Sequence, residues 1–299
     1  MKKYISIDIG GTMIKYGIIN ENHMVEEFYN CDTEADKGGA YLIEKIKKLV
    51  KREQDRKMIY GICISTAGIV DAQKGKIIYA NDSIPDYTGM RVKEILESEC
   101  GIPCEVENDV NCAGLSEQYA GAAKGSKVTV CLTVGTGIGG CILIEGKVFG
   151  GFSNSAGEVG YMRIGDEDFQ SKASSRAMVS QVNAIKGHKD KDQLNGQQIF
   201  ELAKSGDQVC KDAIAGMCET LGYGIANICC VVNPEVVVLG GGIMKQQEYL
   251  QPLLQASLGK YLVEPIRQHV RLTFAQNGNR AGMIGAFFNF QKRQGEIKE

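Results

Sequence analysis

Glycines gather in three short clusters along this 299-residue chain, and each cluster follows a run of residues typical of a β-strand. The clusters lie at 10–11, 135–140 and 240–242, after β-rich runs at 4–9, 128–134 and 235–239. Because glycine has no side chain, a strand that ends in glycines lets backbone N–H groups approach a ligand closely. The pattern predicts an α/β protein with ligand-binding turns at its strand ends.

The two halves of the chain open in the same way. Residues 4–9 and 14–19 flank a glycine turn, and residues 128–134 and 141–145 flank the second glycine cluster. Each half is therefore predicted to begin with a β-hairpin. We interpret this as a weak internal duplication that produces two related α/β domains, with a small-molecule site in the cleft between them.

A domain boundary is predicted at 121–127, where small residues and lysines separate a helix from a strand. The N-terminal domain would contain residues 1–121 and a C-terminal helix at about 281–299, and the second domain would contain residues 122–280. Helices are predicted from hydrophobic spacing at 41–53, 91–98, 110–120, 196–205, 207–232, 249–262 and 281–292. Further strands are predicted at 58–64, 74–80, 104–107, 236–239 and 270–275.

Composition excludes several functional classes. Hydrophobic residues make up 43% and charged residues 23%, the balance of an ordinary globular protein. The net charge of −2 offers no general attraction to nucleic acid. No stretch approaches the roughly 20 apolar residues of a membrane span, and Asp8 interrupts any secretory signal. We expect a cytoplasmic protein with neither a membrane nor a nucleic-acid partner.

The eleven cysteines are odd in number, scattered, and without a Cys-x-x-Cys pair. We expect them to be reduced and to behave as small buried hydrophobic residues. A metal or disulfide role is the alternative, with Cys100 and Cys104 as the nearest approach to a ligand pair. Five lie within apolar runs: Cys63, Cys131, Cys141, Cys229 and Cys230.

The first glycine turn carries chemistry suited to phosphate. Gly10 and Gly11 allow a sharp turn, Thr12 can donate to a phosphate oxygen, and Lys15 supplies positive charge. Asp8 can hold Mg²⁺ directly or through water. An ordinary hairpin with a chance acid is the alternative. The segment is not a P-loop, since no G-x-x-x-x-G-K-[ST] motif occurs in the chain.

The second and third clusters extend this interpretation. Gly135, Gly137 and Gly140 formally match the dinucleotide motif G-x-G-x-x-G, but β-rich residues follow them where that motif needs a helix. A phosphate-binding hairpin fits better. The glycines at 240–242 leave room for a flat ring, although a plain strand-to-helix turn is the alternative.

Two polar segments suggest a substrate with hydroxyl groups. Asp109 lies between a predicted strand and helix, where it could be a helix N-cap or could accept a proton from a substrate hydroxyl. Glu158 lies between glycines and could accept hydrogen bonds from sugar hydroxyls or be a solvated acid.

Together these segments resemble the ROK family (repressor, open reading frame, kinase) of bacterial sugar kinases and regulators. The resemblance extends from Asp8 to about Gly285 and keeps the order of the family's motifs. Four motifs carry it: Asp-x-Gly-Gly-Thr-x-x-Lys at 8–15, Glu-Asn-Asp-x-Asn at 107–111, Gly-Thr-Gly-Ile-Gly-Gly at 135–140 and Gly-Glu-Val-Gly at 157–160.

The resemblance implies the actin-like sugar-kinase fold, with two ribonuclease-H-like domains closing over ATP and a sugar, and a homodimer. It implies that Asp109 is the general base and that Asp8 helps to place Mg²⁺. It assigns nucleotide binding to Asp8, Gly10, Gly11, Thr12, Lys15, Gly135, Thr136, Gly137, Gly240, Gly241 and Gly242. It assigns sugar binding to Asn81, Asn108, Asp109, Glu158, Tyr161 and Gln170.

The sequence departs from the family in its sugar pocket. Many relatives have a histidine where this chain has Tyr161, followed by three cysteines that complete a structural zinc site. Residues 162–172 contain no cysteine, so we predict no zinc. Gln170 stands where relatives carry a second sugar-binding glutamate. These changes suggest a more open pocket, which could admit a β-glucoside.

We therefore expect an ATP-dependent kinase that transfers the γ-phosphate to glucose or a β-glucoside, at the 6-hydroxyl. N-acetylmannosamine kinase activity and a sugar sensor without catalysis are the alternatives. A transcriptional repressor is disfavoured, because only seven residues precede Asp8 and leave no room for a DNA-binding module. An acetate-kinase-like or actin-like ATPase is disfavoured by the polyol-binding character of Asp109 and Glu158.

Overall fold

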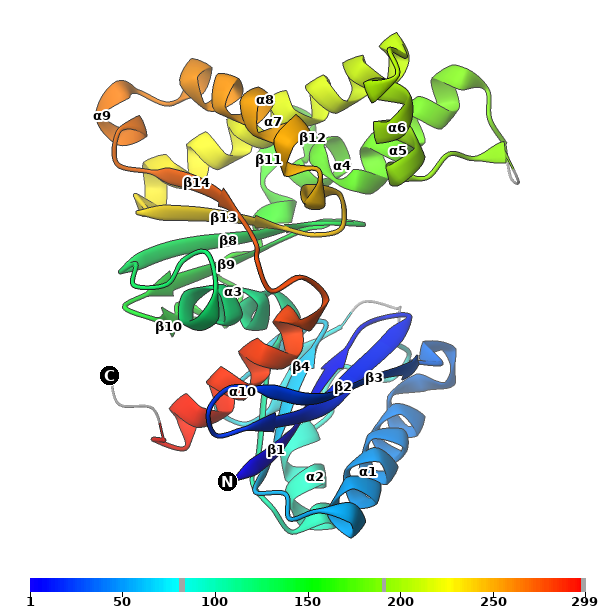
Figure 1. Cartoon of the computed structure of the whole chain (residues 1–299), viewed down its shortest axis with the longest axis vertical. Helices are drawn as coiled ribbons and strands as arrows, with labels where there is room; N and C mark the ends of the chain where they lie inside the picture. Colours follow the sequence, from blue (N-terminus) through cyan, green and yellow to red (C-terminus); the bar gives the residue numbers. More distant parts are fainter. Residues whose placement is uncertain (81–83, 190–191, 297–299) are drawn as a thin grey trace. The chain divides into compact units, whose positions relative to one another are not determined.

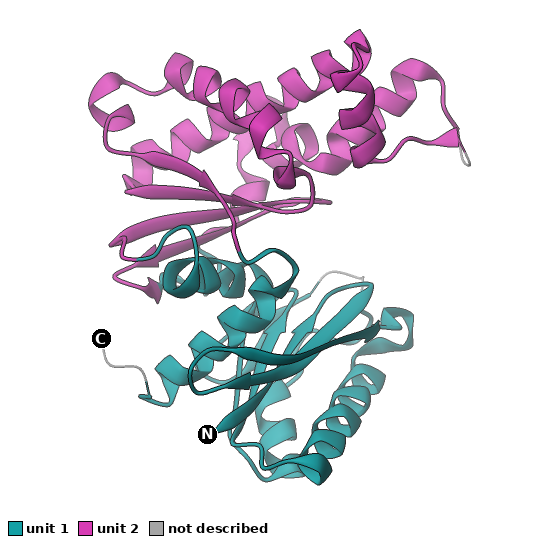
Figure 2. Cartoon of the chain, viewed as in Figure 1, with its two compact units in different colours: residues 1–124, 148–156, 277–299 teal, residues 125–147, 157–276 magenta. Residues whose placement is uncertain are grey.

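The computed structural model describes residues 1–80, 84–189 and 192–296. The chain forms two compact units (Figure 2). Unit 1 contains residues 1–124, 148–156 and 277–299, and unit 2 contains residues 125–147 and 157–276. The chain therefore passes from one unit to the other four times.

Unit 1 is built on a five-stranded sheet in the order β3-β2-β1-β4-β7 (Figure 1). Its strands are β1 (Lys3–Ile9), β2 (Met13–Asn20), β3 (Val25–Asp32), β4 (Gly61–Thr66) and β7 (Cys104–Asn108). The first three are antiparallel neighbours, whereas β1, β4 and β7 run parallel. A separate hairpin pairs β5 (Ile69–Asp71) with β6 (Lys76–Tyr79).

The two faces of this sheet pack against different helices. Side chains alternate along a strand, so Ile5, Ile7 and Ile9 of β1 join one core with buried residues of α1 (Gly38–Arg56) and α2 (Val92–Cys100). Tyr4 packs on the opposite face with Phe287 and Phe290 of α10 (Ala281–Arg293). The helix α3 (Asp109–Ala120) packs against α10. Short 3₁₀ turns lie at Ala35–Lys37 and Gly278–Arg280.

Unit 2 repeats the arrangement with the order β10-β9-β8-β13-β14. Its strands are β8 (Val128–Val134), β9 (Ile138–Ile144), β10 (Lys147–Val148), β13 (Val236–Gly240) and β14 (Arg271–Phe274). As in unit 1, an antiparallel hairpin (β8 and β9) is extended by parallel strands (β13 and β14). The predicted fold, two related α/β sheets that each begin with a glycine hairpin, is confirmed.

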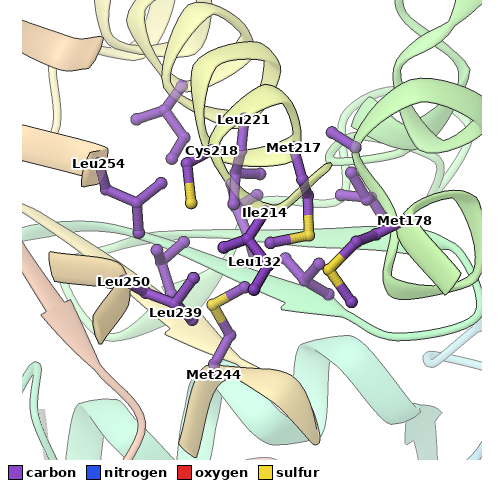
Figure 3. Close-up of a cluster of buried hydrophobic side chains, with 14 of the residues drawn as sticks. Leu132, Met178, Ile214, Met217, Cys218, Leu221, Leu239, Met244, Leu250 and Leu254 are labelled. Carbon is purple, nitrogen blue, oxygen red and sulfur yellow. The ribbon is translucent and has the colours of Figure 1, made fainter. Parts of the chain in front are cut away.

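Helices of unit 2 pack over its sheet. They are α4 (Phe169–Ala173), α5 (Ser175–Lys186), α6 (Gly196–Lys204), α7 (Gln208–Val232), α8 (Gln247–Tyr261) and α9 (Glu264–Arg267), and a small hairpin pairs β11 (Arg163–Ile164) with β12 (Glu167–Asp168). Short 3₁₀ turns lie at Val159–Tyr161 and Ile243–Lys245. Leu132 and Leu239 of the sheet meet Ile214, Met217 and Leu221 of α7 in the core (Figure 3).

The helix α7 corrects one expectation from the sequence. With 25 residues and a mean hydropathy of 1.4 in its most apolar part, it is the one described helix long and apolar enough to cross a membrane. Its apolar side chains instead supply the core of unit 2, where Ile214, Leu221 and Ile225 are fully buried. Burial among α4, α5, α6 and α8 accounts for its hydropathy.

The strand β3 and the helix α5 are among the elements that were not predicted from the sequence. The edge strand β3 has no fully buried residue, so it lacks the apolar alternation that marks a strand. The helix α5 begins at a sequence-local signal, the Ser174 side chain that accepts from the backbone N–H of Ala177, and this cap was overlooked. The strand predicted from residue 58 begins only at Gly61, where the ring of Phe290 fills the space that a Cβ would need.

Close packing of α3 and α10 generates a prediction. A Cβ on Gly285 would lie 1.7 Å from the backbone oxygen of Cys112, so Gly285→Ala must push the two helices apart. We expect a loss of about 1–3 kcal/mol or more in the free energy of unfolding, measured by urea titration. Gly216→Ala is the matched control, because apart from the nearby backbone of α7 itself no atom lies within 4 Å of its Cβ position. It should stabilise α7 by up to about 1 kcal/mol, and equal effects of the two changes would contradict the packing argument.

Candidate functional site

The ends of three parallel strands bring polar residues together in unit 1. Asp8 of β1 is in register with Ser65 of β4, and Ser65 is in register with Glu107 of β7. Asn108 ends β7 one residue later, and Asp109 begins α3. Because neighbouring strands lie about 4.8 Å apart, the register alone places these side chains along one edge of the sheet.

Both carboxylate oxygens of Asp8 have partners. Ser65 Oγ donates to Oδ1 at 2.7 Å, and Lys15 Nζ donates to Oδ2 at 3.4 Å. A Cβ on Gly282 would lie 2.4 Å from the Asp8 carboxyl carbon, so this glycine lets the first turn of α10 approach the carboxylate. The predicted phosphate contact Lys15 is thus an ion-pair partner of the predicted metal ligand Asp8.

Thr33, the residue directly after β3, is hydrogen-bonded to the first glycine turn. The Thr33 backbone N–H donates to the Thr12 oxygen at 2.8 Å, and its hydroxyl donates to the Gly10 oxygen at 2.6 Å. Thr33 is fully buried, whereas Gly11 and Thr12 are exposed. Sequence reasoning missed Thr33, because no motif connects it to a turn twenty residues earlier.

The helix cap at the start of α3 is Asn108, and Asp109 is the first helical residue. Asn108 Oδ1 accepts from the backbone N–H groups of Val110 at 2.8 Å and Asn111 at 3.0 Å. Its Nδ2 donates to the Gly68 oxygen at 2.8 Å and to Asp109 Oδ1 at 3.1 Å. The Asn108 side chain therefore orients the Asp109 carboxylate, which lies in the first turn where the helix dipole favours negative charge.

A buried acid, Glu107, directly precedes Asn108 and Asp109 in the chain. Glu107 is 5% exposed, and its Oε1 accepts from the Asn108 backbone N–H at 2.8 Å and from Asn111 Nδ2 at 3.0 Å. Burial raises the pKa of Glu107, and these two donors oppose the rise only in part.

In unit 2 the second glycine turn is held by α5. The Ser175 backbone N–H and hydroxyl both donate to the Gly135 oxygen at 2.9 Å. Gln170 lies against the same turn, since a Cβ on Gly137 would lie 2.5 Å from Gln170 Oε1. A Cβ on Gly160 would lie 3.1 Å from that oxygen. Sequence reasoning missed Ser175 but named Gln170, which the fold places beside two of the glycine segments.

Glu158 and Tyr161 follow in the loop that Gly157 begins. Gly157 and Gly140 approach so closely that a Cβ on either would lie 2.5 Å from the other's oxygen. Neighbouring protein atoms desolvate the Glu158 carboxyl and raise its pKa, although much of the residue is exposed. Tyr161 is 60% exposed. Between Tyr161 and Gln170 the hairpin β11–β12 is braced by Arg163 and Asp168, whose side chains are 2.8 Å apart.

The third glycine cluster lies beside the second. Gly240 is in register with Thr133 on the parallel strand β8, which ends just before Gly135. Gly241 has φ +110°, and a Cβ there would lie 2.2 Å from the Val134 oxygen, so only glycine fits. The segment is a strand-to-helix turn, and Gly242 has open space at its Cβ position.

Asn81, a predicted sugar-binding residue, lies outside the described residues. Among the residues that the structure describes, no three or more His, Cys, Asp or Glu side chains are grouped to hold a metal ion. All eleven cysteines are free thiols, and the eight buried ones all lie in strands or helices. Cys230, by contrast, is exposed near the end of α7, where the apolar run predicted burial.

The buried Glu107 predicts a pH dependence of stability. The folded protein holds the Glu107 proton to a higher pH than the unfolded chain does, so this group lowers the free energy of unfolding as pH rises through that interval. Glu107→Gln keeps an acceptor for both donors and has no proton to lose. Urea titrations between about pH 4 and 8 should show a smaller decline for the variant. Parallel profiles for the two proteins would contradict the assignment.

Sequence comparison places the chain among known proteins. It is 48% identical to an uncharacterized protein from Clostridium perfringens, over 98% of this chain and 99% of that protein. It is 29% identical to a beta-glucoside kinase from Klebsiella pneumoniae, over 97% of this chain and 96% of the kinase.

Two solved structures of ROK family proteins are similar to this chain. A ROK family glucokinase from Streptomyces griseus, in complex with glucose and AMPPNP, superposes with a TM-score of 0.82 at 26% identity, over 95% of this chain and 97% of that one. A ROK family protein from Streptococcus pneumoniae in complex with sucrose gives a TM-score of 0.87 at 26% identity, over 99% of this chain and all of that one (100%). The fold is thus the actin-like, ribonuclease-H-like fold of these proteins.

A family model described as the ROK family matches residues 4–293, nearly the whole chain. The matched residues include the strand ends of unit 1 and all three glycine turns. The chain therefore belongs to the ROK family.

Proposed function

We propose that this protein, an ATP-dependent carbohydrate kinase, transfers the γ-phosphate of ATP to the 6-hydroxyl of glucose or of a β-glucoside. The observation that carries the proposal is the edge of the unit 1 sheet, where Asn108 holds the Asp109 carboxylate and Ser65 holds the Asp8 carboxylate. The beta-glucoside kinase relative and the glucose-bound neighbour support a sugar of this kind.

Asp109 is the proposed general base. Its carboxylate takes the proton of the sugar 6-hydroxyl as that oxygen forms a bond to the γ-phosphorus, and the bond from the γ-phosphorus to the bridging oxygen breaks to release ADP. Positioning and charge neutralisation account for most of the rate in such transfers. The base itself contributes about 10²–10⁴-fold.

The remaining proposed roles divide between the units. Sugar hydroxyls are bound by Asn81, Asn108, Glu158, Tyr161 and Gln170. Phosphates are bound by Gly10, Gly11, Thr12, Lys15, Gly135, Thr136 and Gly137, and the adenosine borders Gly240, Gly241 and Gly242. For Asn108 a sugar contact must share an amide that already donates to Gly68 and Asp109.

Asp8 fits a role toward Mg²⁺. Its carboxylate is a hard oxygen donor, and Mg²⁺ is generally bound by one or two carboxylates, waters and substrate phosphates. When bound, the ion would neutralise phosphate charge. Ser65 and Lys15 keep the Asp8 carboxylate oriented at the strand end. No zinc is proposed, and a cytoplasmic homodimer is the proposed state of the enzyme.

Gln170 supports an uncharged sugar contact. Its side-chain oxygen lies against Gly137 and Gly160, so the amide borders both the proposed phosphate turn and the segment that carries Glu158. An amide keeps hydrogen bonding to hydroxyls without adding a second negative charge beside the phosphates.

The acceptor is identified by ADP release with Mg-ATP. The panel contains glucose, mannose, fructose, N-acetylmannosamine, N-acetylglucosamine, cellobiose and gentiobiose. We expect turnover with glucose or with the β-linked disaccharides, and mass spectrometry of the product should place the phosphate on a 6-hydroxyl. Turnover with N-acetylmannosamine alone would replace the proposed acceptor. No turnover by folded protein that binds ATP would favour a sugar sensor.

Asp109→Asn tests the base. Loss of the proton acceptor should lower kcat about 10²–10⁴-fold, equivalent to about 3–5 kcal/mol in the barrier. Asp212→Asn, at an exposed position on α7, is the matched control and should leave kcat unchanged. Steady-state kinetics with the preferred sugar measures both. An Asp109→Asn enzyme with normal kcat would refute the assignment.

A further inference from the structure

A buried carboxylate holds together two segments that are far apart in the chain. Glu117, near the end of α3, is fully buried. Its Oε2 accepts from the backbone N–H of Ala122 at 2.8 Å, and its Oε1 accepts from the backbone N–H of Asn277 at 2.9 Å. Hydrogen bonds to a buried carboxylate are among the stronger ones in proteins.

These two segments are where the chain passes between its units. Of the four passages, the first lies between residues 124 and 125 and the last between 276 and 277. Ala122 lies two residues before Lys124, the last residue ahead of the first passage, and Asn277 directly follows the last passage. The Glu117 carboxylate therefore ties the first passage to the last on the unit 1 side.

Further contacts close the same cluster. Asn277 Nδ2 donates to the backbone oxygen of Ser116 at 3.1 Å, and the Ala123 backbone N–H donates to the backbone oxygen of Glu117 at 3.0 Å. A Cβ on Gly121 would lie 2.1 Å from Glu117 Oε2, so Gly121 leaves the space that the carboxylate occupies. We call Glu117, Gly121, Ala122 and Asn277 the clasp.

The clasp is continuous with the two helices that reach the proposed site. The helix α3 begins at Asp109 and ends just before Gly121. The helix α10 follows Asn277 after one 3₁₀ turn, and its Gly282 lies against the Asp8 carboxyl. Because α3 and α10 meet closely at Gly285 and Cys112, the clasp, both helices and both acids form one packed body.

We propose that Glu117 is a positioning residue of the kinase. Resting on the proposed function, this inference adds that the clasp fixes the first and last passages to α3 and α10. Asp109, at the start of α3, and Asp8, against the first turn of α10, thereby keep their mutual placement. Misplacement of reacting groups by about 1 Å can cost about 100-fold in rate, which sets the sensitivity of this arrangement.

Hydrogen exchange tests the clasp without reference to activity. In Glu117→Gln the amide oxygen can accept one N–H, but the new NH₂ group faces the other donor. Gly121→Ala displaces an unchanged carboxylate and provides a second route. We expect at least one of the Ala122 and Asn277 amides to exchange about tenfold faster or more in each variant. The matched controls are Glu53→Gln, a buried acid at the end of α1, and Gly216→Ala.

Kinetics tests the positioning role. In both clasp variants kcat should fall about tenfold or more, whereas the controls should keep wild-type kcat. Wild-type exchange at both amides would overturn the clasp. Faster exchange with normal kcat would overturn its role in positioning. A wild-type protein that phosphorylates no sugar would refute the proposed function by that result alone, while the exchange rates still decide the clasp.

Discussion

The register of three parallel strands is the constraint on which the proposed site depends. Asp8, Ser65 and Glu107 share one row across β1, β4 and β7. Side chains alternate between the faces of a sheet, so a slip of one residue would turn each of them to the opposite face. The isoleucines of β1 pack beneath α1 and α2 and prevent that slip, because it would expose them. The apolar core of unit 1 thereby fixes the direction of its acids.

Glycines serve a second purpose that their clusters in the sequence do not show. Those in the turns at 10–11, 135–140 and 240–242 lie at strand ends, as expected for backbone that approaches a ligand. Gly282 and Gly285 lie in α10 instead, where they let a helix approach Asp8 and Cys112. The same absence of a Cβ thus forms the turns and brings the supporting helix close to an acid.

The sequence allowed much of the fold to be predicted, because its elements carry strong local signals. The β1–β2 and β8–β9 hairpins have apolar strands around glycine turns, and α1, α7 and α10 have long helical spacing. The edge strand β3 was missed because exposure on an edge weakens the apolar alternation. The exposure of Cys230 was missed because an apolar run does not reveal which face of a helix the core covers.

In the proposed site, too, some features follow from local sequence signals and others only from the packed fold. The sequence by itself determined the chemistry: carboxylates at 8, 109 and 158, glycines at the turns and an amide at 170, each recognisable from residue type and motif. Only the tertiary structure decided what orients them. Ser65, Thr33, Ser175 and Glu117 act across long separations in the chain, through hydrogen bonds that exist only once strands and helices have packed. Such partners follow from burial and register, which no local pattern of residues encodes.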